Sequence, residues 1–237
     1  FRFDLMGVLD IETLNEARKA LLKINPDIIM YGEGWTGGES TLPESERGMK
    51  INAPRTPGIG MFSDDIRDAV KGHVFYMDEL GFVNGAADRG EELKQAVTCA
   101  KWAKSPMQSI NYLSCHDNYT LWDRFIISNS HESEEMRIRM NKLAAAILFT
   151  AQGIPFFLHG EEFARTKISE ADGAPVENSY CSPLSVNAID YDRAEQFSDL
   201  KAYYKGLIAL RRAHKSFYLD TVAVSYTHLR AHETSAH

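Results

Sequence analysis

The stretch FRFDLMG, residues 1–7, alternates apolar and charged side chains and then ends in apolar residues and a glycine. Alternation with a period of two is typical of a β-strand. Two charged residues, Arg2 and Asp4, lie where this strand is expected to end. A chain terminus is usually frayed and polar. We therefore predict an internal strand of a sheet or barrel rather than a natural start.

Further apolar runs followed by polar or acidic residues occur along the chain. They predict strands within IIMYGEGW (28–35), GIGMFSDD (58–65), SINYLSCHD (109–117) and IPFFLHGEE (154–162). Helices are expected between them, since apolar residues recur there at helical spacing and capping residues precede them. The expected helices are 11–24 after Asp10, 65–71 before Gly72, 90–100, 134–152 after Ser133, and 197–213.

This alternation of strand and helix favours parallel β/α units. The two candidate architectures are a doubly wound sheet and a (β/α)8 barrel. A doubly wound sheet that binds nucleotides usually carries a glycine-rich phosphate loop, and neither GxGxxG nor GxxxxGK is present. In a barrel, the polar strand ends meet at one face, where active sites lie. We therefore favour the barrel.

Composition excludes several classes of partner. The net charge of −7 argues against nucleic acid, which binds basic surfaces. No apolar run reaches the roughly 18 residues that a membrane span needs. The three cysteines have no metal-binding spacing, and their odd number favours free thiols in the cytoplasm over a secreted protein.

Three of the predicted strand ends carry acids beside aromatic or basic residues: Asp4, Glu33 and Asp117. Residues that follow parallel strands of one barrel converge, although they are distant in sequence. Glycosidic bond cleavage needs one carboxylic acid to protonate the leaving oxygen and one carboxylate to attack or stabilise the anomeric centre. The three acids together therefore predict a glycosidase site.

Several motifs of the sequence resemble those of a known family. FRFDLMG, YGEGW and NYLSCHDN are similar to the signatures of strands 4, 5 and 7 in the α-amylase superfamily of glycoside hydrolases. Longer motifs resemble those of type I pullulanases, which cut α-1,6 branch linkages. These motifs are YGEGWTGG, PGIGMFSDDIRDAVKG, HDNYTLWD, QGIPFFLHGEEFARTK and YYKGLIALRRAH.

The resemblance implies a role for each matching residue. Asp4 matches the nucleophile that forms a covalent glycosyl–enzyme intermediate, and Glu33 matches the general acid and base. Asp117 matches the third acid, which stabilises the distorted sugar ring. The implied substrate-binding residues are Arg2 beside the nucleophile, Trp35 as a stacking platform, His116, Asn178 and Tyr180.

The resemblance covers residues 1–217 and implies the C-terminal part of a (β/α)8 TIM barrel, about strands 4 to 8, without strands 1 to 3. Residues 218–222 are expected to begin a truncated C-terminal region. Residues 223–237 resemble a translated sequencing adapter, so we predict no metal site at His228 and His232 despite their i, i+4 spacing.

The resemblance also implies that the parent enzyme is a monomer that acts on α-glucan polysaccharides, and we predict neither cofactor nor metal. An incomplete barrel by itself is expected to be insoluble or molten, and inactive. The alternatives are an isoamylase or α-1,4 amylase of the same superfamily, or a non-catalytic glycan-binding barrel. The presence of all three acids, with Arg2 and His116, favours a catalytic protein.

Three further features have more than one interpretation. Asp64 and Asp65 are predicted to line the cleft, or Asp65 to cap the following helix. One of Glu161 and Glu162 is predicted to support the site or contact substrate. The four residues Met136, Met140, Leu143 and Ile147 are predicted to pack into the core from one helix face.

Overall fold

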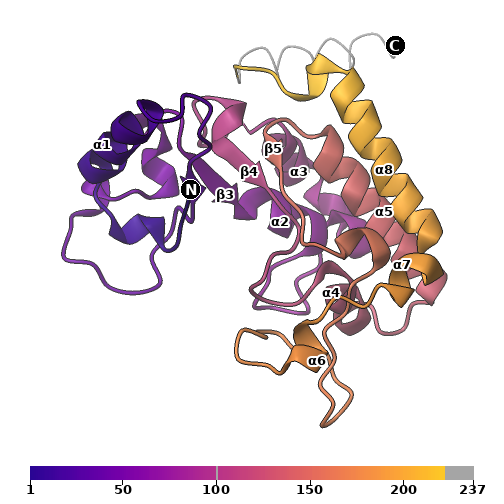
Figure 1. Ribbon diagram of the computed structural model, residues 1–237. Helices are drawn as coiled ribbons and strands as arrows, with labels where there is room; N and C mark the ends of the chain where they lie inside the picture. Colours follow the sequence, from indigo (N-terminus) through magenta and orange to yellow (C-terminus); the bar gives the residue numbers. More distant parts are fainter. Residues whose placement is uncertain (100, 222–237) are drawn as a thin grey trace.

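Five short strands form one parallel sheet in the order in which they occur in the chain (Figure 1). The structure is a computed structural model and describes residues 1–99 and 101–221. The strands are β1 (Arg2–Phe3), β2 (Tyr31–Gly32), β3 (Gly60–Ser63), β4 (Ser109–Asn111) and β5 (Ile154–Pro155). The predicted parallel α/β arrangement is confirmed, with β1 and β5 as the two edges of the sheet.

Eight α-helices are assigned among the described residues. They are α1 (Ile11–Leu22), α2 (Asp64–Lys71), α3 (Gly90–Val97), α4 (Leu121–Ser128), α5 (Glu134–Thr150), α6 (Leu184–Asn187), α7 (Asp192–Gln196) and α8 (Ser198–Ala213). Five of these helices were predicted, and α4, α6 and α7 were not. No helix in the described ranges is both long and apolar enough to cross a membrane.

Capping residues set the ends of the predicted helices. Asp10 accepts a hydrogen bond from the Thr13 amide at 2.7 Å and begins α1. The Ser133 hydroxyl accepts from the Met136 amide at 3.2 Å and begins α5. Helix α2 ends at Gly72, whose φ of 89° belongs to the region that favours glycine. A Cβ there would lie 1.9 Å from a backbone oxygen, so a larger residue would strain this turn.

Consecutive residues of β3 pack on opposite faces of the sheet, as a strand period of two requires. Met61 packs with Leu14 of α1 on one face. Phe62 points to the other face, where its ring lies 5.0 Å from the ring of Tyr112 and 5.3 Å from that of Phe156. Helices and loops cover the first face, and an aromatic cluster lies on the second.

The largest core cluster lies where α2, α4, α5 and α8 pack together, and Figure 1 shows α5 and α8 side by side. Arg211 of α8 joins the two helices, since it donates to the carbonyls of Phe149 at 2.9 Å and Ala151 at 2.7 Å. The predicted apolar face of α5 is partly wrong. Met140 is buried, but Leu143 is 44% exposed, and alanines form the centre of the contact.

Candidate active site

Arg2 lies at the centre of the candidate site, on the edge strand β1. Its Nη1 donates to Asp4 Oδ1 at 2.9 Å, and its Nη2 donates to Glu33 Oε1 at 2.9 Å. Its guanidinium carbon lies 5.9 Å from the centre of the Phe62 ring. Partial burial lowers the pKa of Arg2, but its hydrogen bond to Asp4 and the charges of Glu33, Asp4 and Asp117 outweigh this, so the pKa is raised. Arg2 therefore brings two of the predicted acids together and interacts with the charge of the third.

Glu33 follows β2 directly and is buried, with its side chain 8% exposed. Its Oε2 accepts a hydrogen bond from the backbone amide of Leu5 at 2.7 Å, while Oε1 contacts Arg2. Leu5 has φ 43° and ψ 47°, a left-handed conformation that is uncommon for leucine. The turn that follows β1 thus supplies a backbone donor to the acid that follows β2.

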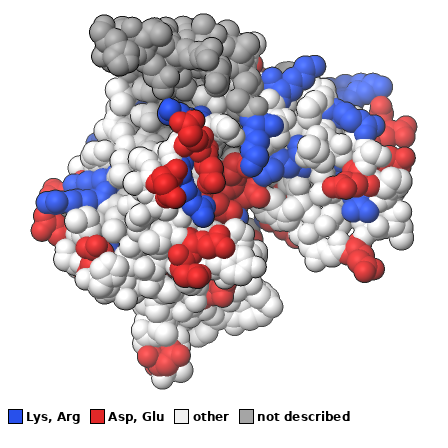
Figure 2. Space-filling model, turned by 180° about the vertical axis from the view of Figure 1, so that it is seen from behind, with Lys and Arg blue, Asp and Glu red and all other residues white. Residues whose placement is uncertain are grey.

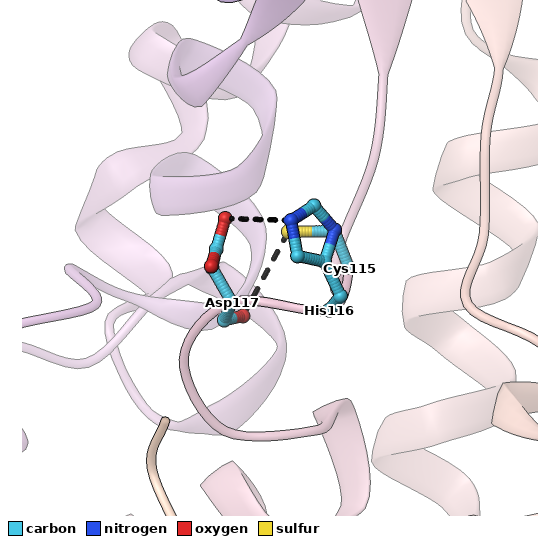
Figure 3. A group of neighbouring side chains, drawn as sticks. All are labelled: Cys115, His116 and Asp117. Carbon is cyan, nitrogen blue, oxygen red and sulfur yellow. Dashed lines mark hydrogen bonds and ion pairs between the residues drawn. The ribbon is translucent and has the colours of Figure 1, made fainter. Parts of the chain in front are cut away.

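Asp4 and Asp117 are the accessible acids of the group. The side chain of Asp4 is 72% exposed and that of Asp117 is 41% exposed. His116 Nε2 lies 3.2 Å from Asp117 Oδ2, and Figure 3 shows both on the loop that follows β4. A ligand can therefore reach both of these carboxyl groups more readily than the buried Glu33.

Comparison with known proteins finds relatives of this chain. No family model matches the sequence. The pullulanase of Bacillus subtilis (strain 168) is 40% identical over 236 residues, which are 97% of this chain and 32% of that protein. This chain is homologous to a segment of pullulanases. It spans about one third of the length of that relative.

Solved pullulanase structures are also similar to this chain in fold and sequence. The Paenibacillus barengoltzii pullulanase in complex with maltohexaose and α-cyclodextrin has a TM-score of 0.88 and 46% identity, covering 94% of this chain and 35% of that one. The Anoxybacillus sp. LM18-11 pullulanase in complex with maltotriose has a TM-score of 0.89 and 43% identity, covering 94% and 31%. These similar proteins therefore bind malto-oligosaccharides.

Three other predicted substrate-binding residues of this pullulanase homologue lie apart from the contacts of Arg2. They are Trp35, Asn178 and Tyr180. Trp35 is partly buried and packs against the aromatic cluster that includes Phe62 and Tyr112. Asn178 and Tyr180 lie on the loop before α6, where both are exposed, Tyr180 by 79%. In the described part of the chain, neither residue has a hydrogen bond to the three acids. Their role in binding substrate stays a prediction.

Asp64 and Asp65 belong to a separate charged group. Lys50 forms ion pairs with both, at 2.8 Å to Asp65 Oδ2, and Lys101 pairs with Asp65 at 2.6 Å. These neighbours lower the pKa of Asp65 although its burial alone would raise it. The prediction that Asp65 caps α2 is wrong, because the Ser63 hydroxyl accepts from the Ile66 amide instead.

The charged group borders a pocket of about 270 Å³, and the three predicted catalytic acids do not line it. Its lining consists of Asp64, Asp65, Asp68, Ala69, Glu92, Gln95, Ala96 and Lys101. Figure 2 shows that acidic side chains also gather near the middle of the back face, beside lysine and arginine side chains. Acids are therefore common on this face of the protein, and the contacts of Arg2 distinguish Asp4 and Glu33 from the others.

A buried polar network lies behind the loop that carries His116 and Asp117. Glu161 is 3% exposed; its Oε2 accepts from the Ser114 hydroxyl, and the Tyr204 hydroxyl donates to its Oε1 at 3.2 Å. Burial raises the pKa of Glu161 to about 7, although the hydrogen bond from Ser114 and the charge of Lys71 oppose the shift. Glu161 thus contacts Ser114 just before that loop, as expected of a residue that supports the site, and contact of Glu161 or Glu162 with substrate stays a prediction.

Lys71 is a second buried ionisable group in this region and was not predicted. It is 2% exposed, and burial, together with the charge of Arg67, lowers its pKa to about 7. Arg67 in turn donates to the Tyr112 hydroxyl at 2.6 Å. The sequence gives little indication of this group, because Lys71 precedes Gly72 at a helix end, where a lysine is usually exposed.

Proposed function

We propose that this chain forms the C-terminal part of the catalytic (β/α)8 barrel of a retaining glycoside hydrolase that cleaves α-1,6-glucosidic linkages in pullulan, starch or glycogen. Its five strands correspond in this proposal to barrel strands 4 to 8. The observation that carries the proposal is the pair of contacts from Arg2 to Asp4 and Glu33. The carboxyl groups of a retaining pair lie about 5–5.5 Å apart, and a shared guanidinium keeps two carboxyl groups close.

In the proposed mechanism, Asp4 attacks the anomeric carbon while Glu33 gives a proton to the leaving glycosidic oxygen. The bond from carbon to that oxygen breaks, and a covalent ester to Asp4 forms. Glu33 then takes a proton from water, whose oxygen attacks the anomeric carbon and releases Asp4. Asp4 is exposed enough to reach a sugar.

The other residues orient the substrate in this proposal. Asp117 accepts hydrogen bonds from sugar hydroxyls, and His116 lies beside it at 3.2 Å. Trp35 offers an aromatic face for a glucose ring. Glu33 accepts hydrogen bonds at both oxygens, from Arg2 and from Leu5. Each carboxyl oxygen has two lone pairs, so Glu33 can carry the proton that it gives to the glycosidic oxygen while it keeps both of these donors.

The substrate class follows from the similar proteins. Pullulanases that are 43–46% identical have been solved with maltotriose and maltohexaose. We propose that this chain likewise takes an α-glucan, and that it needs neither cofactor nor metal for the bond cleavage, because two carboxyl groups supply the chemistry.

The test is an exchange of segments. Residues 1–217 replace the matching segment of the Bacillus subtilis pullulanase, and the chimera is assayed for maltotriose release from pullulan. Asp4→Asn and Glu33→Gln should each lower the rate by about 10²–10⁴-fold or more, because each removes a group that the chemistry needs. Glu12→Gln, an exposed change in α1, is the matched control and should leave the rate unchanged.

The chimera assay is expected to give a different result for each alternative function. Cleavage of α-1,4 linkages alone would favour an amylase. Binding of maltotriose without hydrolysis would favour a non-catalytic glycan-binding barrel. We expect the 237-residue chain alone to hydrolyse no pullulan, because its sheet has two unpaired edges at β1 and β5. Full activity of the chain alone would contradict the assignment to part of a barrel.

A further inference from the structure

We propose that Lys167 is a positioning residue, which holds the segment 178–180 in place relative to the loop that carries Asp117. This role rests on the proposed function and on the substrate contacts expected of Asn178 and Tyr180. Lys167 lies on the loop between β5 and α6 and is 3% exposed. A lysine is rarely buried without a partner, so the contacts of Lys167 identify its role.

Ser179 is the partner of the buried ammonium. Lys167 Nζ donates to the Ser179 hydroxyl oxygen at 2.6 Å, and this hydroxyl donates to Asn187 Oδ1 at 2.8 Å. Asn187, the last residue of α6, also donates through Nδ2 to the Ser179 carbonyl oxygen at 2.7 Å. Ser179 is therefore held at both its side chain and its backbone.

The residues on either side of Ser179 face solvent. Ser179 is 1% exposed, whereas Asn178 and Tyr180 are both exposed. The segment belongs to no helix or strand, so its place depends on contacts of this kind. Because the three residues are consecutive, a fixed Ser179 also fixes the backbone from which the two exposed side chains project.

The backbone of Lys167 is joined to the element that follows Asp117. Asp123 of α4 is fully buried, and its Oδ2 accepts a hydrogen bond from the Lys167 amide at 2.9 Å. Its Oδ1 accepts from the Thr166 hydroxyl. Helix α4 comes directly after the loop of Asp117. Lys167 thus connects this part of the candidate site to the segment 178–180.

The charge of Lys167 also acts on the candidate site. Burial lowers the pKa of Lys167, and the charge of Arg165 adds to this effect. The charges of Asp123 and Asp117 oppose the shift, so the ammonium and the Asp117 carboxylate attract each other. A neutral side chain at this position would remove that attraction together with the hydrogen bond to Ser179.

The expected consequence is weaker substrate binding rather than slower bond cleavage. Displacement of the segment 178–180 removes contacts that the substrate makes both before and during cleavage, so KM rises while kcat stays nearly constant. A lysine with a purely structural role would behave differently. Its loss would lower the fraction of folded enzyme, and thereby the apparent kcat, without a change in KM.

The test uses the chimera that carries residues 1–217 in the Bacillus subtilis pullulanase. Lys167→Met keeps a long side chain without the ammonium, and we expect KM for pullulan to rise about tenfold while kcat changes less than about threefold. Ser179→Ala removes the partner hydroxyl and should raise KM by a similar factor. The double variant should be no worse than Lys167→Met, because both changes remove the same contact. Lys205→Met, at an exposed lysine of α8, is the matched control and should leave KM unchanged.

Calorimetric binding of maltotriose to the same proteins separates this role from the proposed function. A chimera that binds maltotriose without hydrolysing pullulan would contradict the proposed function. A tenfold weaker Kd in Lys167→Met and Ser179→Ala would still support the role of Lys167. If Lys167→Met does not fold, Ser179→Ala decides by the same criterion. Unchanged KM and Kd, a loss of kcat alone, or a chimera that neither binds nor hydrolyses would overturn the role of Lys167.

Discussion

Two acids of this protein, Glu33 and Glu161, have similar burial and opposite surroundings. Glu33 contacts a permanent cation, Arg2, at the edge of the sheet and lies beside exposed acids. Glu161 contacts two hydroxyl groups inside the core behind the sheet. The comparison teaches that burial alone does not distinguish a candidate catalytic acid from a structural one. The partners do, because a cation next to open space permits chemistry, while hydroxyls in a closed core stabilise the fold.

Removal of Arg2 should have the largest effect on activity. In the chimera, Arg2→Ala should lower kcat/KM for pullulan by about 10²-fold or more, since a preorganised charge beside the reacting groups is lost. Arg2→Lys should restore only part of the rate, because an ammonium cannot contact both carboxylates as the planar guanidinium does. Arg139→Ala, an exposed arginine of α5, should leave the rate unchanged. Equal effects of Arg2→Ala and Arg139→Ala would remove Arg2 from the site.

Removal of Glu161 should instead act on stability. Glu161→Ala leaves the Ser114 and Tyr204 hydroxyls without this partner in the core, so the free energy of unfolding should fall by about 2–4 kcal/mol. Urea unfolding of the chimera, followed by circular dichroism, measures the change. Glu162→Ala is the matched control and should cost about 1 kcal/mol, because the Glu162 carboxylate accepts only from the Gly160 amide. Equal losses would contradict the structural role of Glu161.

The pH dependence of stability gives a second measure of the same contrast. The folded pKa of Glu161, about 7, lies above its ordinary value of 4.5, so the folded state binds the proton more tightly. Its contribution is therefore fully present below pH 4.5 and is lost as pH rises towards and through 7, by about 3 kcal/mol in total. Glu161→Gln should flatten this part of the profile. A profile with the same slope in both proteins would show that Glu161 does not titrate as described.

The smallest loss of stability is expected for a change at Tyr204, the α8 residue of the buried network around Glu161. Tyr204→Phe removes the hydroxyl that contacts Asn141 at 2.8 Å and Glu161 at 3.2 Å but keeps the buried ring. The free energy of unfolding should fall by about 1 kcal/mol, the usual net value of a buried hydrogen bond. Tyr203→Phe, the neighbouring and more exposed tyrosine, should change it less. A larger loss at Tyr203 would place the important contact elsewhere on α8.

The sequence was most informative where a single local pattern determines structure. The caps Asp10 and Ser133 and the stop at Gly72 were found because each acts within one turn of chain. The parallel order of the five strands followed from their alternation with helices. Helix α4 was missed although Thr120 caps it, because its eight residues are apolar on more than one side and show no clear face.

Prediction from sequence was weaker where burial or a contact depends on elements that are distant in the chain. Leu143 follows the apolar period of α5 but lies outside its contact with α8, where small alanines permit close packing. The three acids were named from their strand ends, yet nothing local indicated that Arg2 contacts two of them at once. The pair Lys71 and Glu161 was also beyond local reasoning, since burial of each depends on helices packed from elsewhere in the chain.

The order of the strands has a consequence for how the candidate site assembles in time. Among the described strands, each of β2 to β5 pairs with the strand before it in the chain. Arg2, Asp4 and Glu33 lie within the first 33 residues, and their contacts close one short loop of chain. Asp117 arrives only after two further strands. During synthesis, the contacts of Arg2 with Asp4 and Glu33 can thus form before Asp117 is made.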